Sequence, residues 1–275
     1  MALPVALQLY SVRDEMAADF RGTLEQVKAL GYDGVEFAGL FGQEPAQIKR
    51  MLAEIGLAAV SAHVPLEALL ASPEAVFAAY REIGCGFVAV PYVTEERRPG
   101  AAGFADTIKD IRALGEAARA QGVTLLYHNH DFEFEKVNGE YGLDVLYREI
   151  PPELLQTEID VCWVKVAGLS PADYIKKYAG RAPVVHLKDF FMKGDKKPEK
   201  LYALIGLADD GEPQQEELFG FRPVGHGKQD MPAILCAVEQ AGAQWVVVEQ
   251  DEPAPGDTRL ASVEKSREYL KSQGW

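Results

Sequence analysis

Short β-branched runs alternate with longer amphipathic stretches along the whole chain, and this alternation limits the available folds more than any other feature. Most of the amphipathic stretches have helical spacing and are rich in Ala, Glu, Lys, Arg and Leu: Gly22–Leu30, Pro45–Ile55, Pro73–Ile83, Phe104–Gln121, Pro171–Tyr178 and Met231–Gln240. Eight runs have the length and composition of strands: Val5–Tyr10, Gly34–Ala38, Ala58–Val64, Phe87–Tyr92, Val123–His130, Leu155–Val161, Pro183–Lys188 and Trp245–Gln250. Strands that alternate with helices predict an α/β fold with a parallel sheet.

Eight such units in a chain of 275 residues favour a closed (β/α)8 barrel, the TIM barrel, over an open doubly wound sheet. The glycine-rich phosphate-binding motifs that accompany many open sheets are absent from the sequence. No Pro- or Ser-rich linker divides the units, so a single domain is predicted over residues 1–275. The segment 190–224 interrupts the rhythm after the seventh strand, and we expect it to be a long loop insertion over the barrel mouth.

The charge balance excludes one large class of function. Asp and Glu number 42 against 28 Lys and Arg, which gives a formal net charge of −14. A surface this acidic repels the phosphate backbone, so we expect no nucleic-acid partner. No apolar run approaches the roughly 18 residues of a membrane span, and the three cysteines lack the spacing of a zinc site or a disulfide framework. We therefore expect a cytoplasmic protein without a membrane partner.

Polar side chains collect where the predicted strands end, which is where barrel enzymes place their active sites. They are Gln8, Tyr10, Glu36, His63, Tyr92, His128, His130, Glu158, Asp160, His186, Lys188, Glu249 and Asp251. Because side chains alternate across a strand, Glu158 and Asp160 share one face, as do His186 and Lys188. Carboxylates buried together need positive charge beside them. This mixture of acids and imidazoles therefore predicts a divalent metal with oxygen and nitrogen ligands.

Seven stretches at these positions occur in the order known from one family and cover nearly the whole chain. They are Leu7–Val12 (LQLYSV), Gly31–Glu36 (GYDGVE), Tyr127–Phe134 (YHNHDFEF), Glu158–Trp163 (EIDVCW), His186–Asp189 (HLKD), Gly225–Asp230 (GHGKQD) and Val248–Asp251 (VEQD). With these motifs the chain resembles the sugar phosphate isomerase/epimerase family, a branch of the xylose isomerase-like TIM-barrel superfamily. Each motif alone is weak, whereas together they are specific for the family and not for a substrate.

The resemblance implies one divalent metal ion, manganese first, with magnesium, cobalt or zinc as alternatives. The family typically binds it through Glu, Asp, His and Glu on the last four strands, and Asp160, His186 and Glu249 fall on three of those positions. The fourth position departs from the pattern, because His128 stands where relatives often have Glu. Either His128 is itself a ligand, or Glu158 is the ligand and His128 is free to act as a base.

The resemblance also implies an enzyme, with proton abstraction next to a carbonyl and an enediolate that the metal stabilises. The roles fall on three catalytic residues (Glu158, His130 and Lys188) and six substrate-binding residues (Gln8, Tyr10, Glu36, His63, Trp163 and His226). Relatives that use two carboxylates as a proton pair suggest Glu158 and Glu249 for that role. For the loop around His226, an alternative is a purely structural turn in which Asp230 caps the next helix.

The resulting hypothesis is a metal-dependent isomerase or epimerase of a keto sugar, polyol or inosose. A dehydratase, lyase or hydratase of inososes or 3-keto sugars is the alternative on the same scaffold. A sugar-binding protein without catalysis is the alternative from another class. The family's three-zinc endonucleases would need more His ligands and a basic groove. The expected partner is a small carbohydrate, and whether the chain forms a homo-oligomer is left open.

Overall fold

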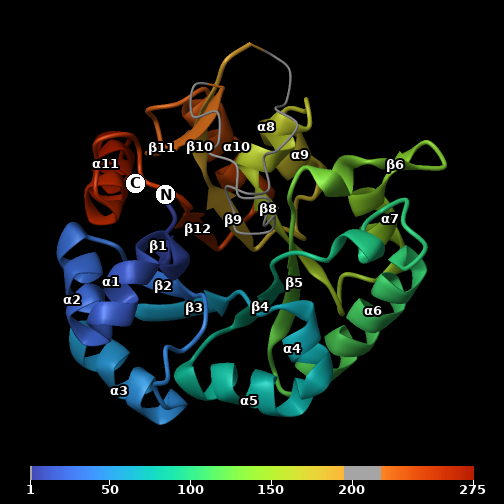
Figure 1. Ribbon diagram of the computed structural model, residues 1–275, viewed down its shortest axis with the longest axis horizontal. Helices are drawn as coiled ribbons and strands as arrows, with labels where there is room; N and C mark the ends of the chain where they lie inside the picture. The colour runs from blue at the N-terminus through green and yellow to red at the C-terminus, as the bar shows by residue number, and fades with distance from the viewer. Residues whose placement is uncertain (1, 195–217) are drawn as a thin grey trace.

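Eight parallel strands form the centre of the computed structural model, which describes residues 2–194 and 218–275 (Figure 1). They are β1 (Val5–Gln8), β2 (Gly34–Phe37), β3 (Ala58–Ala62), β4 (Phe87–Val90), β5 (Thr124–His128), β8 (Gln156–Asp160), β9 (Val184–Leu187) and β12 (Trp245–Val248). Their order is β3-β2-β1-β12-β9-β8-β5-β4. A single parallel bridge between His63 and Ala89 joins the two outer strands and nearly closes the barrel.

The predicted strands are all present, although each ends one or two residues before its predicted end. The reason is visible at β1, where the chain leaves the barrel wall after Gln8 and Tyr10 lies in a 3₁₀ turn. The side chain of Gln8 accepts the backbone N–H of Tyr10 at 2.9 Å and stabilises this turn. A polar residue at the end of a strand can therefore begin the loop instead of continuing the strand.

Helices surround the strands in Figure 1. The α-helices are α1 (Arg13–Ala18), α2 (Phe20–Leu30), α3 (Pro45–Ile55), α4 (Leu66–Ala71), α5 (Pro73–Ile83), α6 (Phe104–Ala120), α7 (Gly142–Glu149), α8 (Val161–Val166), α9 (Pro171–Lys177), α10 (Met231–Ala241) and α11 (Arg259–Ser272). Short 3₁₀ helices are η1 (Leu9–Val12), η2 (Glu95–Arg97) and η3 (Phe132–Phe134). Helix α2 illustrates the local signals, since Asp19 caps its N-terminus and Gly31, with φ of 95°, ends it.

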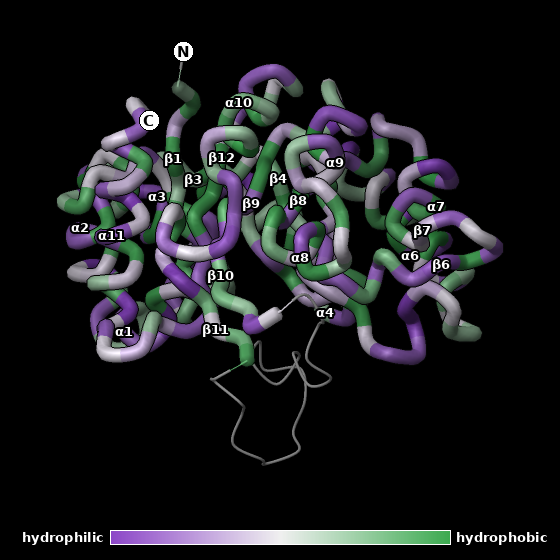
Figure 2. Tube along the Cα trace, turned by 90° about the horizontal axis from the view of Figure 1, so that it is seen from above, coloured by the Kyte–Doolittle hydropathy of each residue, from purple (hydrophilic) through white to green (hydrophobic). Residues whose placement is uncertain are grey.

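Most residues of the strands are apolar and appear green in the centre of Figure 2, and buried apolar clusters lie on both sides of the strands. The larger cluster lies between the strands and the helices, and residues such as Leu24, Phe77 and Val185 are fully buried in it. A smaller cluster, Ala6, Val60, Ala89, Leu126, Val184 and Val247, comes from the strands alone and fills the barrel interior. The polar residues of the strand ends therefore lie on top of a packed core, not in an open pore.

The two ends of the predicted insertion 190–224 are not loop. Strand β10 (Asp189–Met192) pairs antiparallel with β11 (Phe219–Arg222), opposing Phe190 to Phe221 and Met192 to Phe219. These apolar side chains pack with Cys162, Trp163 and Val166 of α8. Residues 195–217, the middle of the insertion, lie outside the described residues. A second short hairpin, β6 (Lys136–Val137) with β7 (Glu140–Tyr141), was not predicted.

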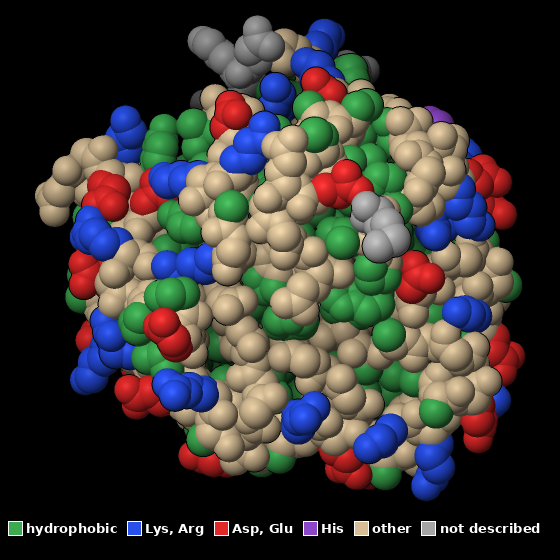
Figure 3. All heavy atoms as spheres, turned by 180° about the vertical axis from the view of Figure 1, so that it is seen from behind, with side chains coloured by type: hydrophobic (Ala, Val, Ile, Leu, Met, Phe, Trp, Pro, Cys, Tyr) green, Lys and Arg blue, Asp and Glu red, His purple; other side chains and the backbone are tan. Residues whose placement is uncertain are grey.

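On the face shown in Figure 3, acidic and basic side chains alternate around the edge and do not gather into one basic patch. Only Leu70 and Phe191 are exposed large apolar residues among those that the structure describes. Within residues 2–194 and 218–275, no helix combines the length and the apolarity needed to cross a membrane.

Candidate functional site

Strand register brings the polar strand ends together in neighbouring pairs. Gln8 lies beside Glu36, His128 beside Glu158, and Asp160 beside His186. Glu249 follows β12, whose last residues pair with β9. Side chains far apart in the sequence therefore meet in the barrel because of the order and register of the strands.

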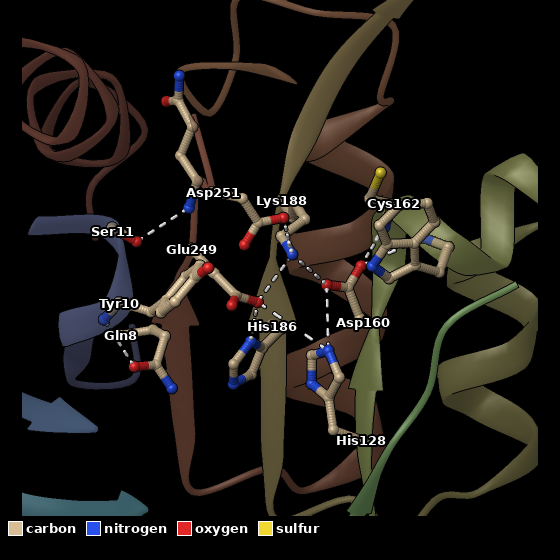
Figure 4. Close-up of polar contacts among 12 residues, drawn as sticks. Gln8, Tyr10, Ser11, His128, Asp160, Cys162, His186, Lys188, Glu249 and Asp251 are labelled. Atoms are coloured by element: carbon tan, nitrogen blue, oxygen red, sulfur yellow. Dashed lines mark hydrogen bonds and ion pairs between the residues drawn. The ribbon is translucent and has the colours of Figure 1, made fainter. Parts of the chain in front are cut away.

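The last strands of the barrel supply a compact group of possible metal ligands, drawn in Figure 4. His128, Asp160, His186 and Glu249 each offer one ligand atom, all four are buried, and the four atoms lie within 4.8 Å of one another. Nε2 of His128 is 3.7 Å from Oδ2 of Asp160 and 4.0 Å from Oε2 of Glu249. Nδ1 of His186 is 3.0 Å from the same Glu249 oxygen.

A second group, the lower layer, lies beside His128 and His186. Its acids Glu158 and Glu36 contact Nδ1 of His128 and Nε2 of His186. Its members are Gln8, Glu36, Ser61, His63 and Glu158, and all except His63 are fully or almost fully buried. Nε2 of His63 lies 2.6 Å from Oε2 of Glu158 and 3.1 Å from Oε1 of Glu36. Glu158 therefore faces Nδ1 of His128, while Asp160 and Glu249 face its Nε2.

Lys188 is the buried cation of the site. Its Nζ lies 2.9 Å from Oδ2 of Asp251, 3.0 Å from Oε2 of Glu249 and 3.5 Å from Oδ2 of Asp160 (Figure 4). Burial would lower the pKa of this lysine, but the three carboxylates outweigh burial and hold its pKa well above the ordinary value. Lys188 is therefore a permanent positive charge beside the possible ligands.

The buried acids exceed the positive charge available to them. Burial raises the pKa of Asp160 to about 6 and that of Asp251 to about 7. Burial and the neighbouring Glu36 together raise the pKa of Glu158 to about 7. Burial alone would raise the pKa of Glu36 as well, but the His63 and His186 imidazoles hold it at about 2. An added cation would relieve this excess of acid groups.

The upper group fits a divalent cation. Oδ2 of Asp160 is buried and accepts no hydrogen bond from the described residues. Metal–ligand distances of about 2.0–2.2 Å place neighbouring ligand atoms roughly 3–3.5 Å apart. The pair His186 and Glu249 has this separation already, at 3.0 Å, whereas His128 lies slightly farther out, 3.7 Å from Asp160 and 4.0 Å from Glu249. Two imidazole nitrogens and two carboxylates are also a common donor set for such ions. The residues that would hold the ion are His128, Asp160, His186 and Glu249.

A cavity of about 470 Å³ opens beside this group. Its charged and imidazole lining residues are His63, His128, His130, Lys188, Glu249 and Asp251, and its other lining residues are Tyr10, Ala38, Gly39, Val64, Pro65, Tyr80, Pro91 and Tyr92. Among the residues predicted to bind substrate, Tyr10 and His63 line the cavity, whereas Gln8 and Glu36 belong to the lower layer. The volume lies in the range of small-molecule sites.

His130 and Trp163 lie next to each other at the edge of the site. The His130 ring centroid is 5.3 Å from that of His128 and 5.3 Å from that of Trp163. Nζ of Lys188 lies 5.6 Å above the Trp163 ring, whose other contacts are with Phe219 and Phe221 of the hairpin. Burial lowers the pKa of His130 well below its ordinary value, so the imidazole is neutral.

His226 is not brought into the cluster, since it is exposed and its ring lies 6.4 Å from that of Tyr269. The loop around it instead surrounds Asp189, whose carboxylate accepts the N–H groups of Gly225, Gly227 and Gln229 at 3.0–3.1 Å. A Cβ at position 227 would lie 2.2 Å from an Asp189 oxygen, so this approach requires glycine. Asp230 caps α10, as the structural alternative predicted.

Three residues that support the site were missed from the sequence. Asn129 exchanges two hydrogen bonds with the backbone of Asp160 and so ties the end of β5 to β8. Ser61 donates to Glu36, and its position two residues before His63 was the available signal. Glu133 accepts from the Tyr127 hydroxyl and from the backbone N–H of His130. Its signal was weak, because nothing local shows that an acid in YHNHDFEF is buried.

Comparisons with known proteins agree with this geometry. The model of the family described as xylose isomerase-like TIM barrel matches residues 24–273. An inosose dehydratase from Lacticaseibacillus casei is 22% identical over 278 residues, covering 91% of this chain and 88% of that protein. An inosose dehydratase from Clostridium tetani is 24% identical over 184 residues, covering 66% of this chain but only 57% of that protein.

Two solved structures share the fold over nearly the whole chain. A sugar phosphate isomerase/epimerase from Parabacteroides distasonis superposes with a TM-score of 0.75 at 20% identity, covering 98% of each chain. A xylose isomerase-like TIM-barrel protein from Mycobacterium smegmatis, in complex with magnesium, superposes with a TM-score of 0.69 at 16% identity, covering 98% of this chain and 96% of that one. The strand order, the polar strand ends and the family match lead to one conclusion: this chain belongs to the xylose isomerase-like TIM-barrel family.

Proposed function

We propose that this chain is a divalent-metal-dependent enzyme that removes a proton next to the carbonyl of a small keto sugar, oxidised polyol or inosose. The observation that carries the proposal is one cavity lined by two of the possible metal ligands, a neutral imidazole and a buried ammonium group. When bound, the cation would supply a positive charge that polarises the substrate carbonyl. The mixed donor set suits manganese or zinc better than magnesium.

His130 has the properties of the base. It lines the cavity, its imidazole is neutral, and its Nδ1 has no hydrogen-bond partner among the described residues. Its orientation is supported from behind, because Glu133 accepts the backbone N–H of His130 at 2.8 Å. A neutral imidazole within reach of a substrate C–H can take that proton.

Lys188 has the properties of the group that stabilises negative charge after His130 has taken the proton. It lines the same cavity, carries a proton and is held in place by Asp251 and Glu249. An ammonium group that keeps its proton in this position can stabilise the negative charge that follows proton loss and can donate a hydrogen bond to a departing oxygen.

The pairing of one neutral imidazole, His130, with one ammonium group, Lys188, favours a dehydratase, a carbon–oxygen lyase, over an epimerase. An epimerase returns a proton to the opposite face of the carbon, and the suggested carboxylate pair was Glu158 and Glu249. Glu158 does not line the cavity and is fully buried behind His128. In dehydration, His130 takes the α-proton, the neighbouring C–O bond breaks, and the hydroxyl leaves as water with that proton returned from the His130 imidazolium, while Lys188 stabilises the negative charge. The names of the sequence relatives support this choice.

An isomerase or epimerase of a keto sugar is the second candidate. Glu249 lines the cavity together with His130 and offers a second proton carrier. The name of the Parabacteroides structure is consistent with this reaction, although at 20% identity that likeness shows the fold alone.

Turnover in D₂O separates the two reactions. We expect the Mn²⁺-loaded protein to convert an inosose or a 3-keto sugar into a product lighter by one water, followed by mass spectrometry and NMR. His130→Ala and Lys188→Met should lower this rate by about 10²–10⁴-fold while Mn²⁺ binding is retained. A product of unchanged composition that carries solvent deuterium would identify an epimerase or isomerase. Product without deuterium or water loss would contradict proton transfer altogether.

A further inference from the structure

We propose that Glu36 and Glu158 are positioning residues that set the tautomers of the two histidine ligands. Glu36 would hold the proton of His186 on Nε2, and Glu158 would hold that of His128 on Nδ1. His63 joins the two acids into one unit. The inference rests on the proposed metal site, but it concerns Glu36 and Glu158, neither of which lines the cavity.

Both carboxylate oxygens of Glu36 have hydrogen-bond donors or an imidazole nitrogen close by. Oε1 accepts the side-chain amide of Gln8 at 2.6 Å and lies 2.8 Å from Nε2 of His186. Oε2 accepts the Ser61 hydroxyl. The strand register shifts between Val35 and Glu36, and this shift places Ser61 beside Glu36. Such irregularities redirect side chains near functional sites.

Glu158 has the same relation to the other histidine. Its Oε2 lies 3.3 Å from Nδ1 of His128 and 3.5 Å from Nε2 of His186. Like Glu36, Glu158 has no exposed surface and does not line the cavity. The two acids can therefore act through the imidazoles that they contact. Glu158 also belongs, with His63, His128 and His186, to a second group that could hold a metal ion.

His63 connects these two acids. Its Nε2 lies between the two carboxylates, 2.6 Å from Glu158 and 3.1 Å from Glu36. Its ring stacks on that of His186, with centroids 5.2 Å apart and planes 9° apart. One imidazole therefore bridges two acids that would otherwise repel each other, and the stacking also limits rotation of His186.

The consequence is a defined direction for each ligand lone pair. A neutral imidazole carries one proton, so a proton on Nε2 of His186 leaves Nδ1 free to bind a metal. That Nδ1 lies at hydrogen-bond distance, 3.0 Å, from Glu249, a contact that a metal ion between the two side chains would replace. A proton on Nδ1 of His128 likewise leaves Nε2 free, and this atom faces Asp160 and Glu249. In this arrangement His128 is the fourth ligand and Glu158 supports it, and the tautomer of His128 distinguishes this from a site in which Glu158 itself is a ligand.

The tautomers can be measured directly, because the chain has only five histidines. In ¹⁵N-labelled protein loaded with diamagnetic Zn²⁺, long-range ¹H–¹⁵N spectra report which ring nitrogen carries the proton. His128→Ala and His186→Ala assign the signals. We expect His186 to be protonated on Nε2 and His128 on Nδ1. The opposite tautomers would overturn the inference even if no lower-layer variant folds.

Metal affinity provides the second measurement. Loss of such a supporting carboxylate typically costs 10–100-fold in affinity. We therefore expect Mn²⁺ to bind Glu36→Gln and Glu158→Gln 10–100-fold more weakly than the parent by calorimetry, with unchanged circular dichroism. Glu133→Gln is the matched control, because Glu133 is another buried acid of the barrel that contacts neither ligand. It should bind Mn²⁺ as the parent does.

The two measurements also separate this inference from the proposed reaction, since neither needs a substrate. Parent-like affinity in both lower-layer variants, or an equal loss in Glu133→Gln, would refute the positioning role. The expected tautomers and affinities without any turnover would support the lower layer and contradict the proposed reaction. A parent that binds neither Mn²⁺ nor Zn²⁺ would refute both.

Discussion

The two halves of the barrel carry different chemistry at the same end of their strands. Strands β5, β8, β9 and β12 end in the possible metal ligands, whereas the mouth above β1–β4 is lined mostly by tyrosine, proline and small apolar residues. The polar residues of β1–β3, such as Gln8 and Glu36, lie below the mouth and face the histidines from beneath.

This difference separates two tasks that one cavity must perform. The half formed by β5, β8, β9 and β12, the proposed metal-binding half, concentrates acidic charge that would be unstable alone, and Lys188 compensates part of this charge. The half formed by β1–β4, the apolar half, has no comparable electrostatic cost. The tyrosine, proline and small apolar residues that line its mouth can therefore change without disturbing the charges. Chemistry should therefore depend on the first half, and substrate preference on the second.

The largest effect should follow from removing a ligand in the metal-binding half. Glu249→Ala takes away a carboxylate that contacts Lys188 and both possible histidine ligands. We expect Mn²⁺ affinity to fall by more than the roughly 100-fold upper limit of a supporting-residue change, and metal-dependent turnover to disappear. Calorimetry and elemental analysis measure this loss, and the melting temperature checks the fold. A variant that binds Mn²⁺ as tightly as the parent would contradict the ligand assignment.

The barrel, and most of the side chains that meet at the ends of its strands, could be predicted from the sequence, because periodicity reports which face a side chain occupies. How far each side chain lies along the barrel axis could not be predicted. Glu36 and Glu158 face inward as expected, yet they lie below the ligands, because depth depends on strand tilt, stagger and irregularities such as the one before Glu36. His226 was placed near the site because of its motif, but its loop is held by Asp189.

The hairpin of β10 and β11 was also not predicted. Its strands are only four residues long, and their pairing joins segments separated by residues 195–217, so no local turn signal marks it. Long-range pairing of this kind depends on the packing surface, here Trp163 and its neighbours, which the sequence does not locate.

A smaller effect is expected in the apolar half. Tyr92 lines the cavity and is half-buried. Tyr92→Ala removes part of this wall, and the lost apolar contact, worth roughly 1–1.5 kcal/mol, should raise KM by about tenfold. The value of kcat should change little, because the binding is lost equally in ground and transition states. Tyr92→Phe keeps the ring and should behave as the parent. A fall in kcat equal to that caused by Lys188→Met would show that the halves are not separate.

The smallest effect on metal binding is expected behind the metal-binding half, at Glu133, whose buried carboxyl group is not compensated as the acids of the site are. No cation is among the groups that shift its pKa, and burial raises that pKa to about 8 from an ordinary value of 4.5. Between these two values the folded protein holds a proton that the unfolded chain has released. The contribution of Glu133 to stability is therefore present below about pH 4.5 and is lost as the pH rises toward 8.

Glu133→Gln removes this titration while keeping the shape of the side chain. We expect the free energy of unfolding of the parent, relative to the variant, to fall between pH 5 and 8 with a slope of at most about 1.4 kcal/mol per pH unit. Urea unfolding at several pH values, in the presence of a chelator, measures the difference, and subtraction cancels the other buried acids. Parallel pH profiles for the two proteins would show that Glu133 is ionised in the folded state. In that case a positive charge would compensate Glu133 as Lys188 compensates the acids of the site, and the contrast between them would disappear.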